Sequence, residues 1–418
     1  MKPTVLLLMP TTTYRAADFI AAGFRTGVRV VVGSEEKQAL EEVAPGGTLA
    51  LDFRDPEAAC RKIIDFAREH PLKAVVGVED ETTVLAAMAS KALGLPHNPV
   101  ESVRATRDKH RMREILRAAG VPVPQFLRIS LAEDPREAAG RVAYPCVLKP
   151  LFLSASRGVI RADRPEEFAS AFLRVKALLS LPEVAEKGGE LARWILAETY
   201  IPGTEVALEG LLVGGILREL ALFDKPDPLE GPFFEETIYI TPSRLPQPFR
   251  REIVACAART ASALGLVEGP VHAELRINTE GVWPLEVAAR SIGGLCSRTL
   301  RFGAGVSLEE LILRHALGTN LDSLEREPCA AGVMMIPIPG AGVLKEFGGV
   351  EKAREVAGIE ELTQSIPLGQ AVTPLPEGSR YLGFIFAKAA SPAAVEEALR
   401  RAHRCLRIVI APGSPGVG

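Results

Sequence analysis

Two glutamates on neighbouring segments are suited in type and spacing to bind a divalent metal ion. Glu274 and Glu286 lie on either side of a turn at Asn278–Gly281, and the apolar residues beside them predict two antiparallel strands of one hairpin. Both carboxylates could therefore project into one site. Magnesium prefers oxygen ligands and is usually bound by one or two carboxylates together with substrate phosphates. Arg290, four residues after Glu286, could neutralise charge that develops on a phosphoryl group.

Three earlier segments could bind the rest of a nucleotide. Lys149 ends an apolar strand, where a buried ammonium group needs an anion. Five residues later, the small residues of Ser154–Gly158 would let backbone N–H groups approach phosphate oxygens. The backbone of Glu198–Glu205 turns at a Pro-Gly pair and could contact an adenine edge, while Glu205 could accept hydrogen bonds from ribose hydroxyls. Taken singly, these segments are also compatible with a strand end, an ordinary turn and a surface hairpin.

The familiar signatures of nucleotide and acyl-transfer enzymes are absent from the sequence. It has no GxxxxGK[ST] loop, no GxGxxG after a predicted strand and no GxSxG elbow. A nucleotide enzyme with this sequence would have to bind phosphates through the segments described above.

The composition argues against several other classes of protein. The 418 residues include 49 Lys and Arg and 52 Asp and Glu, a net charge of −3, and only 6% are aromatic, which argues against a nucleic-acid binder. No apolar run reaches the roughly 18–20 residues that a membrane helix needs. The six cysteines are scattered without a CxxC pair, so we expect a reducing, cytoplasmic environment. Cys296 lies close to the predicted site but has no obvious histidine partner, and we interpret it as a packing residue.

The elements that must position these residues change in character along the chain. In the first hundred residues short apolar strands alternate with helices, which predicts a parallel sheet that binds ligands beyond the carboxyl ends of its strands. The strands are expected at 5–9, 28–32 and 74–78, and the helices at 14–24 and 56–69. A charged helix at 104–119, ended by Gly120, indicates a linker. Mostly antiparallel α+β segments follow, including a two-residue hairpin turn at Gly214-Gly215.

In their order along the chain, these segments resemble the ATP-grasp superfamily over nearly the whole sequence. Arg107–Met112 is similar to the start of the family's Asp-Lys helix, and Ala119–Pro124 to the turn after it. Val282–Arg290, followed by Ile292-Gly293-Gly294, most resembles the branch of L-amino-acid ligases and carnosine synthases. The loop from Asp224-Lys225-Pro226 to Thr241-Pro242 is similar to that branch as well.

This resemblance implies a multidomain ATP-grasp fold with α/β and α+β parts. The expected parts are an N-terminal parallel α/β domain at 1–105, a linker helix at 106–124, a lid subdomain at 125–204, a catalytic subdomain at 205–328, a C-terminal α/β lobe at 329–412 and a disordered tail at 413–418. The lobe is expected either to complete the substrate pocket or to form a homodimer contact.

The resemblance also implies roles for individual residues. ATP would be contacted by Lys109, Lys149, Ser154, Ser156, Arg157, Gly158, Glu198, Tyr200, Ile201 and Glu205. Mg²⁺, with Mn²⁺ as a substitute, would be bound by Glu274 and Glu286. The acyl-phosphate intermediate would be stabilised by Arg290, and the substrates would contact Lys225, Arg290, Gly293 and Gly294.

The expected function is an ATP-dependent ligase of amino-acid or dipeptide type, because the family joins a carboxylate to an amine and releases ADP and phosphate. Its partners would be small-molecule carboxylates and amines, with no nucleic acid and no membrane. Two alternatives stay open. One is an enzyme like those of the purine pathway, with a different acceptor, and the other is a nucleotide-binding protein that has lost catalysis.

One position departs from the family pattern. The family's usual pattern at this place is Glu-x-Asn-x-Arg. Here the pattern runs from Glu286 to Arg290, and Ala288 takes the place of the asparagine. Alanine cannot bind a metal, so a second magnesium would rely on Glu286 and phosphate oxygens, or on another residue such as Asn278 or His272. Arg157 is open to two interpretations, a phosphate contact or a surface charge.

Overall fold

The computed structural model describes residues 2–36, 47–321 and 323–412, and the predicted tail at 413–418 lies outside them. The chain begins with a parallel four-stranded sheet in the order β3-β2-β1-β4. Its strands are β1 (Thr4–Leu8), β2 (Arg29–Ser34), β3 (Thr48–Ala50) and β4 (Ala74–Gly77), and its helices are α1 (Ala16–Arg25), α2 (Pro56–Glu69) and α3 (Asp80–Ala92). The predicted parallel sheet is therefore present. The loops after β1 and β4 carry Arg15 and Asp80 to its carboxyl edge.

The predicted linker helix at 104–119 is two helices, α4 (Val100–Thr106) and α5 (Lys109–Ala118). The break comes at Asp108, whose carboxylate accepts hydrogen bonds from the backbone N–H groups of His110 and Arg111 and so caps the start of α5. The cap places Lys109 in the first turn, and its side chain turns toward the lid.

The lid is an antiparallel sheet in the order β5-β8-β6-β7 with helices packed on one face. Its strands are β5 (Phe126–Ser130), β6 (Cys146–Pro150), β7 (Ile160–Ala162) and β8 (Trp194–Thr199). Its helices are α6 (Pro135–Ala139), α7 (Pro165–Leu179), α8 (Pro182–Gly188) and the 3-10 helix η2 (Gly189–Arg193). Phe168, Phe172 and Val175 of α7 are fully buried against the sheet, so the lid has a core of its own.

A long, eight-stranded sheet runs in the order β13-β12-β9-β10-β11-β16-β20-β18. Its strands are β9 (Thr204–Val213), β10 (Ile216–Asp224), β11 (Ile238–Thr241), β12 (Gly269–Asn278), β13 (Gly281–Ala288), β16 (Ala330–Ile336), β18 (Ile359–Gln364) and β20 (Gly383–Ala389). Both predicted hairpins are confirmed, since Val213 pairs with Ile216 around Gly214-Gly215 and β12 pairs with β13. The sheet runs across the predicted boundary at 328/329.

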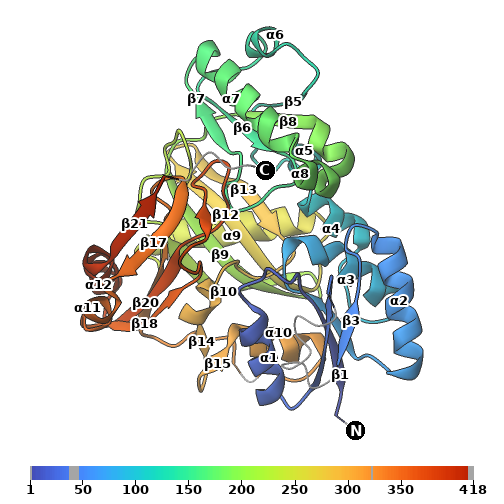
Figure 1. Ribbon diagram of the computed structural model, residues 1–418. Coiled ribbons are helices and arrows are strands. Elements are labelled where there is room, and N and C mark those ends of the chain that lie inside the picture. The colour runs from blue at the N-terminus through green and yellow to red at the C-terminus, as the bar shows by residue number, and fades with distance from the viewer. Residues whose placement is uncertain (1, 37–46, 322, 413–418) are drawn as a thin grey trace.

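The remaining elements pack around this sheet. They are α9 (Gln247–Ala263), η3 (Cys296–Thr299), β14 (Arg301–Phe302), β15 (Val306–Ser307), α10 (Leu308–Ala316), β17 (Gly342–Gly348), α11 (Val350–Arg354), β19 (Ala371–Val372), α12 (Pro392–Cys405) and β21 (Arg407–Ala411). In Figure 1 the lid stands above the long sheet, and the N-terminal domain lies beside its lower part.

The N-terminal domain and the long sheet share one apolar core. Phe19 of α1 and Val32 of β2 belong to the same buried cluster as Leu311 of α10 and Phe384 of β20. One face of the parallel sheet is therefore held against the long sheet by buried apolar surface. Among the described residues, we find no helix with the length and apolar character needed to cross a membrane.

Candidate active site

A cavity lies between the lid and the long sheet. The predicted site residues that line it are Lys109, Lys149, Ser154, Ser156, Glu198, Tyr200, Ile201, Glu205, Glu274, Glu286 and Arg290. The predicted residues that do not line it are Arg157, Gly158, Lys225, Gly293 and Gly294. The fold thus brings lysines, acids and a small-residue loop together from separate segments of the chain.

Glu274 and Glu286 lie directly opposite each other across the β12/β13 hairpin. Side chains at such a pair point to the same face of the sheet, and both line the cavity. Lys109 Nζ lies 3.2 Å from Glu286 Oε2, and Lys225 Nζ lies 3.6 Å from Glu274 Oε2. The two acids are therefore the arrangement that the sequence predicts, and each already has a lysine beside it.

Three carboxylates meet around Lys225. One oxygen each of Glu205, Glu236 and Glu274 lies within 4.8 Å of the others. Burial alone would lower the pKa of Lys225, but these three acids outweigh it and raise that pKa well above its usual value. Burial, followed by repulsion from Glu274, raises the pKa of Glu236 to about 7. Lys225 is thus the cation that these three acids already hold. Glu274 is also the hairpin partner of Glu286, and the carboxylate oxygens of these two acids are ligands of the kind that a hard cation such as Mg²⁺ prefers.

The position of Ala288 has a histidine opposite it. His272 pairs with Ala288 across the hairpin, and its Nε2 lies 3.6 Å from Glu274 Oε1. On its other side, His272 Nδ1 lies 3.2 Å from Oε2 of the buried Glu209. Asn278, by contrast, lies at the hairpin turn and donates to the Pro202 carbonyl. Of the two residues considered as replacement ligands, only His272 lines the cavity.

Lys149 is paired within the chain. Its Nζ lies 2.6 Å from Glu198 Oε2, and Arg113 Nε donates to Glu198 Oε1 at 2.5 Å. Burial opposes ionisation of Glu198, but Arg113 and then Lys149 lower its pKa to about 2. Glu198 therefore acts as the anion that holds Lys149 at the cavity wall. Lys109 Nζ donates to the Leu153 carbonyl at 2.6 Å, which ties α5 to the covering loop.

The covering loop has two consecutive non-glycine residues in the left-handed region, Ala155 with φ 55° and Ser156 with φ 54°. Such backbone strain collects at ligand clamps. Arg157 does not line the cavity, and its Nε donates to the Glu377 carbonyl at 2.7 Å. The N–H of Gly158 donates to the Pro376 carbonyl at 2.8 Å. These two residues attach the loop to the C-terminal part of the chain instead of facing the cavity.

The predicted adenine hinge lies at the cavity wall, but Glu205 is already engaged. Its Oε1 accepts from Lys225 Nζ at 2.8 Å and its Oε2 from Arg276 Nε at 2.9 Å. Arg276 also donates to the Ile201 carbonyl at 2.7 Å, so it fixes the hinge backbone. The ring of Tyr200 stacks with that of Phe234, with centroids 6.5 Å apart.

Arg290 reaches the cavity from the turn after β13. Its Nη2 donates to Asp80 Oδ2 at 2.7 Å and its Nη1 to the Ser291 carbonyl at 2.8 Å. Gly293 and Gly294 form the turn beside it; a Cβ on Gly293 would lie 3.8 Å from Arg290 Nη1, and Gly294 has φ 60°. They shape the surroundings of Arg290 and do not line the cavity.

Sequence reasoning missed several residues of the site. They are Asp80, Arg113, Glu209, Glu236 and Arg276. Asp80 had a usable signal, since it lies three residues after the end of β4, near the carboxyl ends of the parallel strands. Glu236 lies in the loop that is similar to the ligase branch, but that similarity gave Glu236 no role. For Arg113 and Arg276 the sequence shows only charged residues on a helix and a strand.

Three family models match consecutive parts of the chain. They are an ATP-grasp N-terminal domain at residues 20–97, an ATP-grasp domain at 142–299 and an L-amino acid ligase C-terminal domain 2 at 334–411. Among solved structures, an L-amino acid ligase from Bacillus licheniformis is 27% identical with a TM-score of 0.83, and the match covers 98% of this chain and 99% of that one. An N5-carboxyaminoimidazole ribonucleotide synthetase from Thermotoga maritima is 16% identical, with a TM-score of 0.71 over 98% and 100% of the chains, and shares the fold.

Curated relatives match over a shorter length. An alanine–anticapsin ligase from Bacillus subtilis is 30% identical over 262 residues, which is 58% of this chain and 54% of that protein. Carnosine synthase 1 from Gallus gallus is 29% identical over 260 residues, 59% of this chain and 27% of that protein. The chain thus spans about half the length of the first of these relatives. With its fold, its order of domains and these matches, the chain belongs to the ATP-grasp superfamily, in the branch that includes the L-amino acid ligases.

Proposed function

We propose that this protein is an ATP-dependent ligase that joins the carboxylate of one amino acid to the amine of a second and releases ADP and phosphate. The observation that carries the proposal is the meeting of Lys109, Lys149, Glu274, Glu286 and Arg290 around one cavity. The likeness to L-amino acid ligase, alanine–anticapsin ligase and carnosine synthase supports amino acids as the substrate class.

The reaction would proceed in two displacements. An oxygen of the substrate carboxylate attacks the γ-phosphorus of ATP, the bond to the ADP oxygen breaks, and an acyl phosphate forms. The amine nitrogen then attacks the acyl carbon, phosphate leaves, and the nitrogen loses a proton. Because little covalent chemistry falls to the protein, catalysis rests on positioning and charge neutralisation.

The charged residues of the cavity fit these tasks. Lys149, held by Glu198, and Lys109, held by Leu153, are placed to bind phosphate oxygens. Arg290 would stabilise the charge on the acyl phosphate. Glu274 and Glu286 would hold Mg²⁺, or Mn²⁺ in its place, which when bound offsets phosphate charge.

The lid would protect the acyl phosphate from water. The loop at 154–156 lines the cavity, and Arg157 and Gly158 fasten its end to residues 376 and 377. A cover attached in this way would exclude water during the interval between the two displacements.

The six cysteines are free, which favours a reducing cytoplasm as the site of action.

A screen of amino-acid pairs tests the proposal. The protein is incubated with ATP, Mg²⁺ and each pair, and ADP release and dipeptide mass are measured together. We expect at least one pair to yield equal amounts of ADP and dipeptide. Folded protein that binds ATP but yields no dipeptide with any pair would contradict the proposal, and stimulation by bicarbonate or a sugar-phosphate amine would favour the purine-pathway type of acceptor.

A further inference from the structure

The guanidinium group of Arg290 is held by the N-terminal domain. Asp80, the first residue of α3, is 9% exposed, and its Oδ2 accepts from Arg290 Nη2 at 2.7 Å. The two residues are 210 positions apart in the sequence. Asp80 does not line the nucleotide cavity, whereas Arg290 does. The carboxylate therefore contacts Arg290 from the side of the N-terminal domain, outside the nucleotide cavity.

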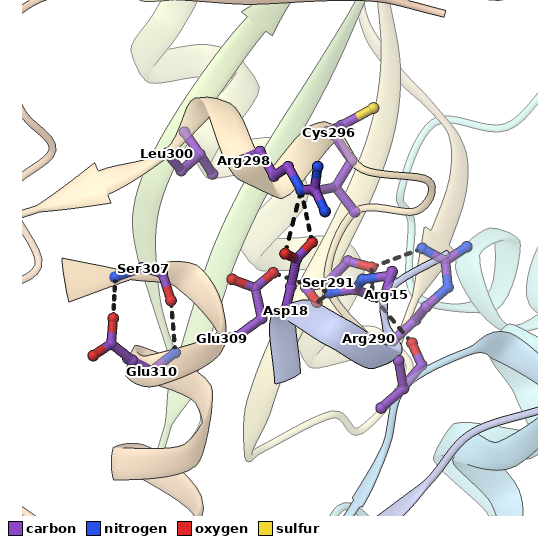
Figure 2. A network of polar contacts seen from close by, with 12 residues as sticks. Arg15, Asp18, Arg290, Ser291, Cys296, Arg298, Leu300, Ser307, Glu309 and Glu310 are labelled. Carbon is purple, nitrogen blue, oxygen red and sulfur yellow. Dashed lines mark hydrogen bonds and ion pairs between the residues drawn. The ribbon is translucent and has the colours of Figure 1, made fainter. Parts of the chain in front are cut away.

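Arg15 fastens the backbone around this contact. It is fully buried, and its Nη2 donates to Ser291 Oγ at 2.6 Å while its Nη1 donates to the Val78 carbonyl at 3.1 Å. Ser291 directly follows Arg290, and Val78 lies two residues before Asp80. Figure 2 shows Arg15 beside Ser291, the residue that directly follows Arg290. One buried arginine thus ties together the two backbone segments that present the Asp80–Arg290 pair.

The charges around Asp80 indicate that the position of the Arg290 guanidinium depends on this carboxylate. Its Oδ1 lies 3.3 Å from Arg107 Nη1, so one carboxylate separates two guanidinium groups. Burial opposes its ionisation, but Arg290 and then Arg107 lower the pKa of Asp80. Without this carboxylate, Arg290 would lose its charged partner and face the unneutralised Arg107. Its guanidinium would then be free to leave the geometry that the cavity needs.

We propose that Asp80 is a positioning residue for Arg290, so that the N-terminal domain sets the placement of the arginine at the reacting phosphate. The inference rests on the proposed function for the role of Arg290. A displacement of about 1 Å at a reacting group can cost about a hundredfold in rate. We therefore expect Asp80→Asn to lower kcat by about 10- to 100-fold, with KM for ATP changed by less than about twofold.

Asp18→Asn is the matched control. Asp18 of α1 accepts from Arg298 Nε at 3.0 Å across the same domain interface, but neither residue contacts Arg290 or lines the cavity. We expect kcat for this variant to stay within about twofold of the wild type. An equal loss in both variants would show a general weakening of the interface and would overturn the positioning role.

A double-mutant cycle separates positioning from a structural role. If Asp80 acts through Arg290, adding Asp80→Asn to Arg290→Ala should change kcat by less than about twofold. A loss as large as that in the wild-type background would overturn the inference. If Asp80→Asn does not fold, Asp80→Glu keeps the charge and moves the carboxylate by one methylene, and it should lower kcat about three- to tenfold. An unchanged kcat in Asp80→Glu would equally overturn it.

Crystal structures keep this test independent of the reaction. In the wild type the Arg290 guanidinium should be ordered on Asp80, and in Asp80→Asn it should turn away or lose density while the rest of the domain interface stays in place. An unmoved, ordered Arg290 in Asp80→Asn would refute the inference. The result holds even if no amino-acid pair is turned over, so failure of the proposed function is seen separately in the substrate screen.

Discussion

Replacing Glu198 by glutamine should destabilise the fold, because it leaves two cations without their anion. The side chain of Glu198 is 2% exposed, and its partners Arg113 and Lys149 are 1% and 14% exposed. Removing one partner of a buried ion pair costs about 3–5 kcal/mol. The pKa change gives a similar figure, since a fall from 4.5 to about 2 corresponds to about 3 kcal/mol.

The same lowered pKa of Glu198 determines how the stability difference between wild type and Glu198→Gln depends on pH. Because the folded-state pKa of Glu198 is lowered, its stabilisation is complete above the unfolded value of 4.5 and is lost as the pH falls toward about 2. At pH 3.5 the unfolded state takes up a proton that the folded state does not, which removes about 1 kcal/mol of the wild-type advantage. The difference between wild type and Glu198→Gln should therefore be smaller at pH 3.5 than at pH 7.

Urea unfolding followed by circular dichroism at the two pH values measures this difference. The control is Glu190→Gln in the same lid, since Glu190 and its partner Arg193 are 68% and 74% exposed. Exposed pairs contribute about 0–1 kcal/mol, so this variant should unfold almost like the wild type. If Glu198→Gln lost no more stability than Glu190→Gln, or lost equally at both pH values, the reasoning about the buried pair would be refuted.

Three further predictions concern turnover, the lid and the thiols. Glu286→Gln should abolish ADP release while leaving the circular dichroism spectrum unchanged, because it removes a metal ligand and not a core contact; retained activity would contradict the metal role. Arg157→Ala removes the side chain that donates to the Glu377 carbonyl and fastens the covering loop, so ATP hydrolysis without amide formation should rise several-fold, and an unchanged ratio of ADP to dipeptide would count against the fastened cover. In the native protein only Cys329 and Cys405 should react with a thiol reagent, because the other four cysteines are buried; rapid reaction of all six would be inconsistent with the packing role.

Local patterns were sufficient to predict the main elements of the site. Alternation of strands and helices predicted the parallel sheet, and the turn at Asn278–Gly281 predicted the hairpin that places Glu274 opposite Glu286. The turn accounts for the hairpin but not for the exact pairing, because its register alone would place Glu274 opposite Leu285. A β-bulge between Glu274 and Leu275 shifts the ladder so that Glu274 meets Glu286. The break before α5 could also have been predicted, since Asp108 is a strong N-cap residue.

Contacts between distant segments could not be predicted in the same way. Asp80 meets Arg290 across 210 positions, and Arg157 meets the Glu377 carbonyl across 220. Nothing near either residue in the sequence specifies its partner, because the packing of whole domains decides it. The continuation of the long sheet into β16 and β20 is of the same kind, since strand order depends on which edges meet in space.

Binding of Mn²⁺ in the presence of a non-hydrolysable ATP analogue, followed by electron paramagnetic resonance, tests the central claim most directly. The wild type should bind the ion, and Glu274→Gln and Glu286→Gln should each weaken binding by at least about tenfold. Glu280→Gln is the control, because this exposed acid lies at the turn between them. Wild-type affinity in both Glu274→Gln and Glu286→Gln would contradict the account.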